Sequence, residues 1–215
     1  MKIRYFGHSC FLLSDSRGRT VVYDPFPPTI GYGRLDITAE TVLVSHGHFD
    51  HNWTEGVRKP CQVIRKPGQH RSHGLDITGI PSFHDKENGE LRGRNIIFCL
   101  QMDGLTLVHL GDLGHDVPEE VRSADIVFAP AGGTYTLDAM EALAAGKGLG
   151  AKIVFPMHFR TADAVFPIAG VSDLSAVPGA VVHNASFLEL TRHTMPEQLQ
   201  FAILRPVGGG IGVRA

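Results

Sequence analysis

The stretch VSHGHFDHNW, from Val44 to Trp53, indicates both the fold and the chemistry of this sequence. Six consecutive residues of this stretch contain three histidines and an aspartate: His46, His48, Asp50 and His51. The apolar run Thr41–Val44 precedes them, so a buried strand is expected to deliver the chain to these polar side chains. In extended backbone, side chains two apart point the same way. His46 and His48 can therefore share one ion; Asp50 keeps that parity, whereas His51 points elsewhere.

The bulk composition is that of an ordinary soluble domain. The chain has 215 residues, of which 43% are hydrophobic and 20% charged, and its formal net charge is -2. This balance gives no electrostatic footprint for nucleic acid or an anionic membrane. No apolar stretch approaches the roughly 18–20 residues of a membrane span, and Cys10–Leu13 is too short for a signal-peptide core. We expect a single cytoplasmic domain spanning residues 1–215.

The cysteine and histidine counts narrow the kind of site. Cys10, Cys61 and Cys99 are odd in number, far apart, and outside any C-x-x-C pair. A disulfide framework and a thiolate zinc site are both unlikely on that basis. The 12 histidines permit metal chemistry with imidazole ligands instead.

Short strands are expected to dominate the first half of the chain. A hairpin is predicted around Asp103-Gly104, because this dipeptide tolerates the positive φ of a type I′ turn. The Pro-rich segment Pro25–Gly33 must be a loop. The other runs with strand character are Ile3–Phe6, Cys10–Leu13, Thr20–Tyr23, Gln62–Arg65, Leu75–Ile80, Asn95–Gln101 and Leu105–Leu110.

The second half mixes strands with one clear helix. The Ala-rich segment Ala139–Leu149 is predicted to be helical, with Thr136 as a plausible N-cap. Ile153–Phe155 is expected to be a strand that delivers the chain to His158. Further strand-like runs are Ile126–Ala129, Ser186–Leu190 and Leu199–Leu204, and the Gly-rich tail Pro206–Ala215 is expected to be frayed.

The hexapeptide His46-Gly47-His48-Phe49-Asp50-His51 resembles the H-x-H-x-D-H signature of the metallo-β-lactamase fold superfamily. Four further landmarks follow the order of that superfamily: Asp24 at a strand end, His84, Asp112 and His158. The resemblance covers about residues 1–160. It implies an α/β fold of the four-layer αββα sandwich type, with metals at one edge between two sheets.

A finer resemblance is to a bacterial and archaeal branch of metal-dependent hydrolases, similar to ascorbate-6-phosphate lactonases and to lipid phosphodiesterases of the same fold. The stretches that carry it are Gly7-His8-Ser9, Gly111–His115, Gly132–Thr136 and Pro156-Met157-His158. We expect no extra domain of the kind that the RNA-processing nucleases carry. Asp112 stands where certain β-lactamases have a cysteine. The sequence departs from the pattern of the branch after Arg160.

The resemblance implies a dinuclear site. Metal one would take His46, His48 and His84; metal two would take Asp50, His51 and His158; Asp112 would bridge them. Two Zn²⁺ ions are expected, with Mn²⁺ or Fe as alternatives. Asp24 would orient a ligating imidazole through its other ring nitrogen, or else be a plain turn residue. His8, His115 and Tyr135 are candidates for substrate-facing or supporting roles, whereas His109 is expected to be a packed histidine.

The leading hypothesis is therefore metal-dependent hydrolysis of a small molecule. A metal-bridging hydroxide would attack an ester, lactone, amide or phosphodiester, and Asp50 would hold its proton. The same scaffold can hold a di-iron redox centre or a metal without a catalytic task. A nucleic-acid enzyme is disfavoured by the charge balance, and a homo-oligomer is left open.

Overall fold

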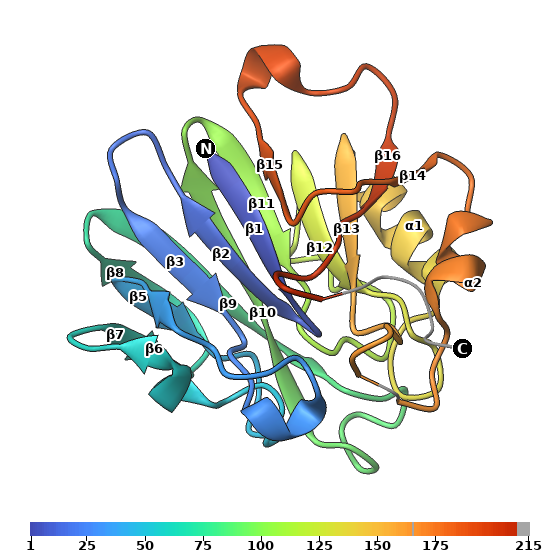
Figure 1. Cartoon of the computed structure of the whole chain (residues 1–215), viewed down its shortest axis with the longest axis horizontal. Helices are drawn as coiled ribbons and strands as arrows, with labels where there is room; N and C mark the ends of the chain where they lie inside the picture. Colours follow the sequence, from blue (N-terminus) through green and yellow to red (C-terminus); the bar gives the residue numbers. More distant parts are fainter. Residues whose placement is uncertain (165, 210–215) are drawn as a thin grey trace.

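The computed structural model describes residues 1–164 and 166–209, which form two β-sheets packed face to face (Figure 1). The first sheet has six strands: β1 (Lys2–Gly7), β2 (Cys10–Ser14), β3 (Thr20–Tyr23), β5 (Thr41–Leu43), β7 (Gln62–Ile64) and β15 (Phe187–Glu189). Their order is β15-β1-β2-β3-β5-β7. Strands β1 and β3 are both antiparallel to β2, and β5 is parallel to β3, so β1, β3 and β5 run in one direction.

The second sheet has eight strands: β8 (Gly68–Ser72), β9 (Leu75–Phe83), β10 (Arg94–Met102), β11 (Leu105–His109), β12 (Ile126–Pro130), β13 (Ile153–Met157), β14 (Ala180–Val182) and β16 (Gln200–Ile203). Their order is β14-β16-β13-β12-β11-β10-β9-β8. The predicted hairpin joins β10 to β11, and Asp103 and Gly104 have φ values of 50° and 75°. Strands β9, β11, β12 and β13 all run in the same direction.

Aromatic and aliphatic side chains from both sheets fill the space between them. In β1, alternation along the strand buries Ile3 and Tyr5 while their neighbours are partly exposed. The ring of Phe11 in β2 lies 4.7 Å from that of Phe128 in β12, which joins the two sheets. Full burial of such a side chain contributes about 1.5–3 kcal/mol. This shared core fixes the positions of the two sheets, and therefore of their strand ends, relative to each other.

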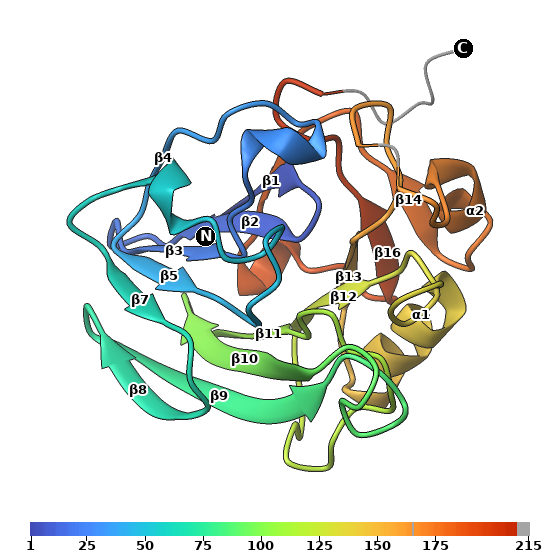
Figure 2. The ribbon, with the colours of Figure 1, turned by 90° about the horizontal axis from the view of Figure 1, so that it is seen from below.

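The two α-helices lie outside the eight-stranded sheet (Figure 2). Helix α1 (Ala139–Gly148) packs on β12 and β13, and α2 (Val171–Ser175) packs on β14 and β16. Strand β12 is buried along its whole length because it is covered on both faces. No helix of the described residues is long and apolar enough to cross a membrane.

The sandwich predicted from the sequence is confirmed, with one outer layer built differently. Outside the six-stranded sheet, the described residues form no α-helix. That face is covered by the 3₁₀ turns η1 (Pro28–Ile30) and η2 (Thr54–Gly56) and by the short pair β4 (Ile37–Thr38) and β6 (Val57–Arg58). A second apolar cluster lies beneath this cover and includes Val22, Phe26, Ile30, Val42 and Val57. The Pro-rich loop thus contributes apolar side chains to the layer in which the sandwich was expected to have a helix.

Two local predictions need correction. Helix α1 has Asp138 rather than Thr136 as its N-cap, because the Asp138 carboxylate accepts the Glu141 N–H while Glu141 accepts the Asp138 N–H. Thr136 lies two residues before the N-cap, where its hydroxyl donates to the Leu137 carbonyl. At the tail, the N–H of Val207 donates to the carbonyl of Tyr5, so the described part is tied to β1. The rest of that tail, residues 210–215, lies outside the described residues.

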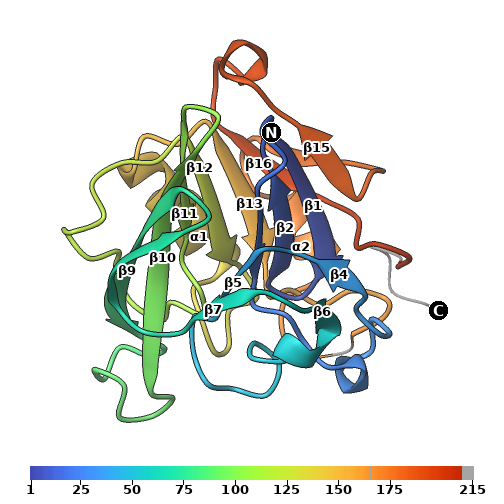
Figure 3. The same cartoon turned by 90° about the vertical axis from the view of Figure 1, so that its left-hand side faces the viewer.

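The topology brings the C-terminal ends of strands from both sheets to one edge of the sandwich. In the first sheet β1, β3, β5 and β7 end there, and in the second sheet β9, β11, β12 and β13 end there. The loops that follow β5 and β9 extend from the lower end of the molecule in Figure 3. Carboxyl ends of parallel strands form the usual place for a site in open α/β sheets. The residues that follow these strands are therefore the candidates for function.

Candidate metal centre

Six of these strand ends deliver polar side chains to the same place. In the first sheet, His8 follows β1, Asp24 follows β3, and the stretch His46–His51 follows β5. In the second sheet, His84 follows β9, Asp112 follows β11 and His158 follows β13. All are buried except His48 and Asp50, which lie at the mouth. Residues more than 100 positions apart thus form one cluster.

The first group of donors consists of three imidazoles. One ring nitrogen from each of His46, His48 and His84 lies within 4.8 Å of the others. Nε2 of His46 is 3.1 Å from Nδ1 of His48, so these two nitrogens face a common point. Tetrahedral Zn²⁺ with bonds of about 2.0–2.1 Å needs donors roughly 3.3 Å apart. The spacing of this group fits such an ion.

The second group contains a carboxylate and three imidazoles. Donor atoms of Asp50, His51, His158 and also His8 lie within 4.8 Å of one another. Nε2 of His8 is 3.1 Å from Oδ2 of Asp50 and 3.0 Å from Nε2 of His51. The predicted set of Asp50, His51 and His158 is thus brought together, and His8 joins it.

Asp112 stands between the two groups. Its Oδ2 is 3.1 Å from Nε2 of His84 in the first group, and 3.2 Å from Nε2 of His158 in the second. The same oxygen is 3.3 Å from Nε2 of His51. Its Oδ1 is buried and has no hydrogen-bond partner among the described residues. An orphaned carboxylate oxygen beside so many imidazoles is costly unless a cation is bound there, so the residues fit a pair of divalent ions.

Burial and mutual proximity prepare these groups for metal binding. Burial, with His51 nearby, lowers the pKa of His46 to about 3, and burial lowers the pKa of His158 to about 3 as well. Both imidazoles are therefore neutral and keep a lone pair for a metal at neutral pH. Burial alone would raise the pKa of Asp112, but the imidazoles of His158 and His51 lower it well below its usual value. The carboxylate is therefore ionised.

Asp24 fixes the orientation of the first-sheet ligands from behind. Its Oδ2 is 3.1 Å from Nδ1 of His51, and its two oxygens accept hydrogen bonds from the N–H and the hydroxyl of Ser45 at 2.7 and 2.6 Å. The Ser45 oxygen is 2.8 Å from Nδ1 of His46. Because the single hydroxyl hydrogen goes to Asp24, the Ser45 oxygen accepts from His46. Both imidazoles therefore present Nε2 to the centre, as a carboxylate behind a ligating histidine ensures.

Backbone conformation is strained at several of these positions. His8, Asp24 and His158 all have positive φ, at 52°, 39° and 52°. Side chains in the left-handed region are uncommon and tend to occur at functional sites. Gly111, which precedes Asp112, has φ 58°, and an added Cβ would lie 2.2 Å from Oδ1 of Asn95. That Cβ would also lie 2.7 Å from Cβ of Ser45, so the glycine lets the Asp112 loop approach both Asn95 in β10 and Ser45 beyond β5 closely.

A pocket of about 350 Å³ opens above the two groups of donors. The residues that line it are His48, Asp50, His84, Leu91, Arg92, Asp112, Tyr135 and His158. The guanidinium of Arg92 lies 5.6 Å from the ring centre of Tyr135, and these two side chains form part of the rim. Tyr135 is thus near the centre, as the sequence suggested. The volume of this pocket suits a small molecule.

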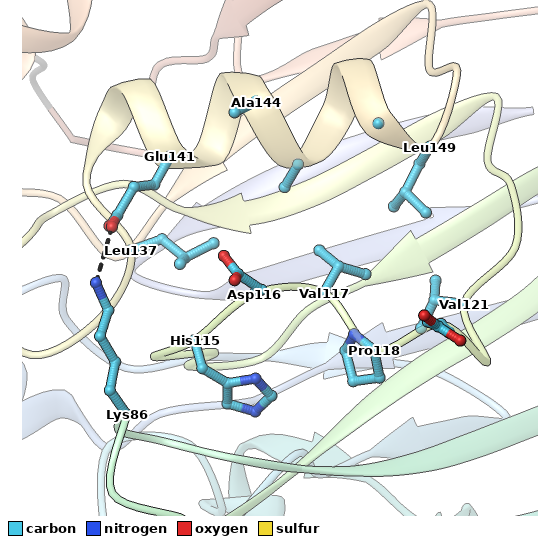
Figure 4. Close-up of a pocket in the computed structure, with 13 residues that line it drawn as sticks. Lys86, His115, Asp116, Val117, Pro118, Val121, Leu137, Glu141, Ala144 and Leu149 are labelled. Atoms are coloured by element: carbon cyan, nitrogen blue, oxygen red, sulfur yellow. Dashed lines mark hydrogen bonds and ion pairs between the residues drawn. The ribbon is translucent and has the colours of Figure 1, made fainter.

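The structure does not bring His115 to this pocket. Nε2 of His115 accepts the N–H of Phe83 at 3.1 Å. Its ring lines a separate cavity of about 360 Å³ below α1, together with Val117, Pro118 and Leu149 (Figure 4). His115 is therefore outside the residues that line the pocket above the donors, and the chain bends at Asp112 and again at His115. His109 is buried and stacks on Tyr23, as expected for a packed histidine.

Sequence reasoning missed three contributors. Ser45 belongs to no recognisable motif, and its position directly before His46 is its one signal in the sequence. Asn95 supports the Asp112 loop, because its Oδ1 accepts the Asp112 N–H while its amide donates to Ser82 and Leu110. Arg92 belongs to a loop that is held by Asp85, whose carboxylate accepts four backbone N–H groups. The D-x-x-x-G spacing from Asp85 to Gly89 is typical of an Asx-type turn. It could have suggested that the Asp85 carboxylate accepts hydrogen bonds from the backbone N–H groups of this loop.

Comparisons with known proteins agree with this geometry. The family model described as the β-lactamase superfamily domain matches residues 2–158. A relative from Methanoculleus marisnigri, named UPF0173 metal-dependent hydrolase, is 30% identical over 194 residues, with 77% of this chain and 84% of the relative covered. A solved structure from Thermotoga maritima is described as a proposed Zn-dependent hydrolase of the metallo-β-lactamase superfamily. It is 33% identical with a TM-score of 0.77, and 94% of this chain and 97% of that chain are covered.

The fold also occurs in a redox enzyme. The diiron β-hydroxylase CmlA from Streptomyces venezuelae has a TM-score of 0.54 and 14% identity, with 73% of this chain and 44% of that chain covered. At that identity only the fold is shared. The family match over most of the chain and the H-x-H-x-D-H stretch lead to one conclusion. The chain belongs to the β-lactamase superfamily domain family, within the metallo-β-lactamase superfamily.

Proposed function

We propose that this protein is a metal-dependent hydrolase with a two-ion centre, loaded with Zn²⁺ in the first instance. The single observation that carries the proposal is the position of Asp112, whose Oδ2 lies 3.1 Å from Nε2 of His84 and 3.2 Å from Nε2 of His158. One carboxylate oxygen is therefore shared by the two groups of donors. The relative from Methanoculleus marisnigri is named a metal-dependent hydrolase, and that name agrees with such an arrangement.

The first group would hold one ion through His46, His48 and His84, and Asp50, His51 and His158 would hold the other. Bound in such a pair, divalent ions polarise a carbonyl or phosphoryl oxygen and lower the pKa of water from ~15.7 to ~7. The ionised Asp112 reduces the repulsion between two dications. Asp24 and Ser45 hold His51 and His46 in their ligating tautomers through the contacts described above.

Asp50 is the proposed proton acceptor. Its carboxylate lies at the mouth, lines the pocket, and is only partly buried. Burial would raise the pKa of Asp50, but the hydrogen bond from His8 and the charge of His51 lower it below its usual range. The group is therefore ionised at neutral pH and can hold a proton during attack at Oδ1, the oxygen that is not directed at His8 and His51. Tyr135 would contact substrate from the rim.

The pocket favours a small substrate that carries negative charge. Arg92 is the cation among its lining residues, and its guanidinium is positioned against the Tyr135 ring. A second cavity of about 370 Å³ shares Leu91, Arg92 and Tyr135 with the first, so the substrate can extend past the rim. We propose an anionic ester, lactone or phosphodiester. The formal net charge of -2 supports a small molecule rather than nucleic acid.

Two alternatives have different outcomes in the same experiment. A di-iron redox centre would give protein that carries iron and absorbs visible light, whereas a metal without a catalytic task would give bound metal and no turnover. Elemental analysis of protein purified without added metal separates the first from a zinc or manganese hydrolase. The fold shared with a diiron β-hydroxylase is the observation that keeps the redox alternative in the experiment.

The test is a substrate panel of esters, lactones and phosphodiesters with Zn²⁺ or Mn²⁺. The proposal predicts metal-dependent hydrolysis of at least one class. His48→Ala and Asp112→Asn should each lower kcat/KM by roughly 100-fold or more, since each removes a metal ligand. Full activity in both variants would remove the basis of the proposal.

A further inference from the structure

His8 lies closer to the second group of donors than its distance in sequence suggests. It follows β1 at the edge of the first sheet, and 1% of its surface is exposed. Its Nε2 is 3.1 Å from Oδ2 of Asp50 and 3.0 Å from Nε2 of His51. Its ring centre is 4.5 Å from that of His158. His8 therefore touches every member of the group that would hold the second ion.

The backbone of His8 is fixed in an unfavourable conformation. Its φ is 52°, and its carbonyl accepts two hydrogen bonds, from the Tyr5 hydroxyl and the His158 N–H, both at 3.0 Å. One of these donors belongs to a residue of the second group itself. Phe166 adds a stacked ring at 5.3 Å on one face. Strain of this kind persists only where surrounding contacts fix it, so the position of the ring is determined by the fold.

A hydrogen bond alone leaves His8 poorly explained. Nε2 of His8 faces both Nε2 of His51 and a carboxylate oxygen of Asp50. A single ring nitrogen either donates one hydrogen or accepts with one lone pair, so it can satisfy only one of these two partners at a time. Nδ1 of His8 is buried without a partner among the described residues. A cation placed among the four donors would engage all of them at once.

We propose that His8 is a fourth protein ligand of the second ion. This proposal rests on the metal binding proposed above. Counting the shared Asp112, the second ion would then have five protein ligands: His8, Asp50, His51, His158 and Asp112. The first ion would have four, namely three imidazoles and Asp112. The two ions are therefore unequal: the second, with one protein ligand more, is retained, and the first exchanges more readily.

The experiment measures retained zinc. Wild-type protein is loaded with Zn²⁺, dialysed against a chelator, and analysed by mass spectrometry for zinc per chain over time. We expect about one ion to leave quickly and one to remain. His8→Asn, which keeps a residue that tolerates positive φ, should lose the retained ion at least roughly tenfold faster. An unchanged rate of zinc loss in His8→Asn would overturn the proposal.

Two further variants serve as controls. His73→Asn makes the same exchange at another left-handed histidine, with φ 46°, which is exposed and lies 3.7 Å from Glu40. It should retain zinc like the wild type. His48→Ala removes a donor of the first group and should keep the slowly lost ion while losing the fast one. Loss of the slow ion in His48→Ala would also contradict the assignment.

A crystal structure of the zinc-loaded wild type provides an independent test that needs no variant. A ligating His8 would have Nε2 at about 2.0–2.1 Å from the second zinc. A separation above about 3 Å, with Nε2–H directed at Asp50, would make His8 a hydrogen-bond donor and would overturn the proposal. Hydrolysis is assayed on the same samples. Retained activity together with a non-ligating His8 contradicts only this inference, whereas zinc binding without any hydrolysis contradicts only the proposed function.

Discussion

Oδ2 of Asp24 lies 3.1 Å from Nδ1 of His51, and both side chains are completely buried. The same carboxylate also accepts two hydrogen bonds from Ser45, which in turn contacts His46. One buried carboxylate thus orients one imidazole of each group of donors. Because Asp24 also lies at a strained φ of 39°, the fold maintains this arrangement at some cost.

Asp24→Asn should weaken metal binding without removing a ligand. The amide has only one accepting oxygen, so it cannot accept from the Ser45 N–H at one position and from His51 and the Ser45 hydroxyl at the other, as the two carboxylate oxygens do. We expect the affinity for Zn²⁺ to fall by roughly 10–100-fold, measured by competition with a chromogenic chelator. Asp36→Asn, an exposed acid paired with Arg58, is the matched control and should bind zinc normally. Equal affinity in Asp24→Asn and the control would contradict the supporting role.

Arg92→Gln should change substrate affinity more than the rate of the chemical step. Its guanidinium lines the pocket, away from the proposed metal ligands. For an anionic substrate we expect KM to rise roughly tenfold with little change in kcat, because one charge-assisted contact is lost. A neutral ester should be nearly unaffected. Arg94→Gln, an exposed neighbour on β10 outside the lining set, is the control. Equal effects on charged and neutral substrates would refute the charge-recognition role.

Gly111→Ala should destabilise the fold and displace the Asp112 loop. An alanine Cβ would lie 2.2 Å from Oδ1 of Asn95 and 2.7 Å from Cβ of Ser45, at a φ of 58°. We expect a loss of roughly 2–5 kcal/mol in the free energy of unfolding, measured in urea. Gly150→Ala has a similar φ of 71° with open space around it, and should cost only about 1–2 kcal/mol. Comparable losses in the two variants would show that crowding at Gly111 is unimportant.

Asp103, at the β10–β11 turn, should give a pH-dependent contribution to stability far from the metal centre. Burial would raise its pKa, but hydrogen bonds from Ser16 and from the Met1 ammonium group lower it. A lowered folded-state pKa means that the ionised form favours the folded state. The contribution is present above the unfolded pKa of about 3.9 and is lost as pH falls through the folded value.

Asp103→Asn tests that sign. Asparagine tolerates the φ of 50°, so the substitution removes mainly the charge. At pH 7 the variant should be less stable by at most about 1 kcal/mol, as for other exposed ion pairs. The difference from the wild type should shrink as the pH drops below about 4. A difference that grows toward low pH would contradict the lowered pKa.

Much of the fold and the candidate ligand set could be predicted from sequence because the signals are local. The Asp103-Gly104 dipeptide predicts its hairpin, and apolar runs predict most strands. The order of His46, His48, Asp50, His51, His84, Asp112 and His158 along the chain suggests one cluster. The structure brings these side chains together, and their roles as ligands await the metal measurements.

The rest depends on contacts between distant segments. Strand β8, with the sequence GQHRS, has no apolar pattern, and it is held as an edge strand by pairing with β9. His115 follows Asp112 by three residues, yet its side chain lines another cavity. The sequence around His8 does not distinguish a ligand from a packed histidine. His8 lies beside His158 because the end of β1 is next to the end of β13 in the fold, where the His158 N–H donates to the His8 carbonyl. Among the described residues the cover of the six-stranded sheet contains no α-helix, and the Pro-rich loop contributes apolar side chains there, including Phe26 and Ile30.

The most direct test follows bound metal and hydrolysis in the same titration. Metal-free protein is titrated with Zn²⁺, and the zinc per chain and the rate with a responsive anionic substrate are recorded at each step. The two-ion account predicts that the retained ion fills first with little turnover, and that the rate then rises with the second ion and saturates at about two ions per chain. Full hydrolysis in the metal-free protein, or saturation of binding without any hydrolysis, would contradict it.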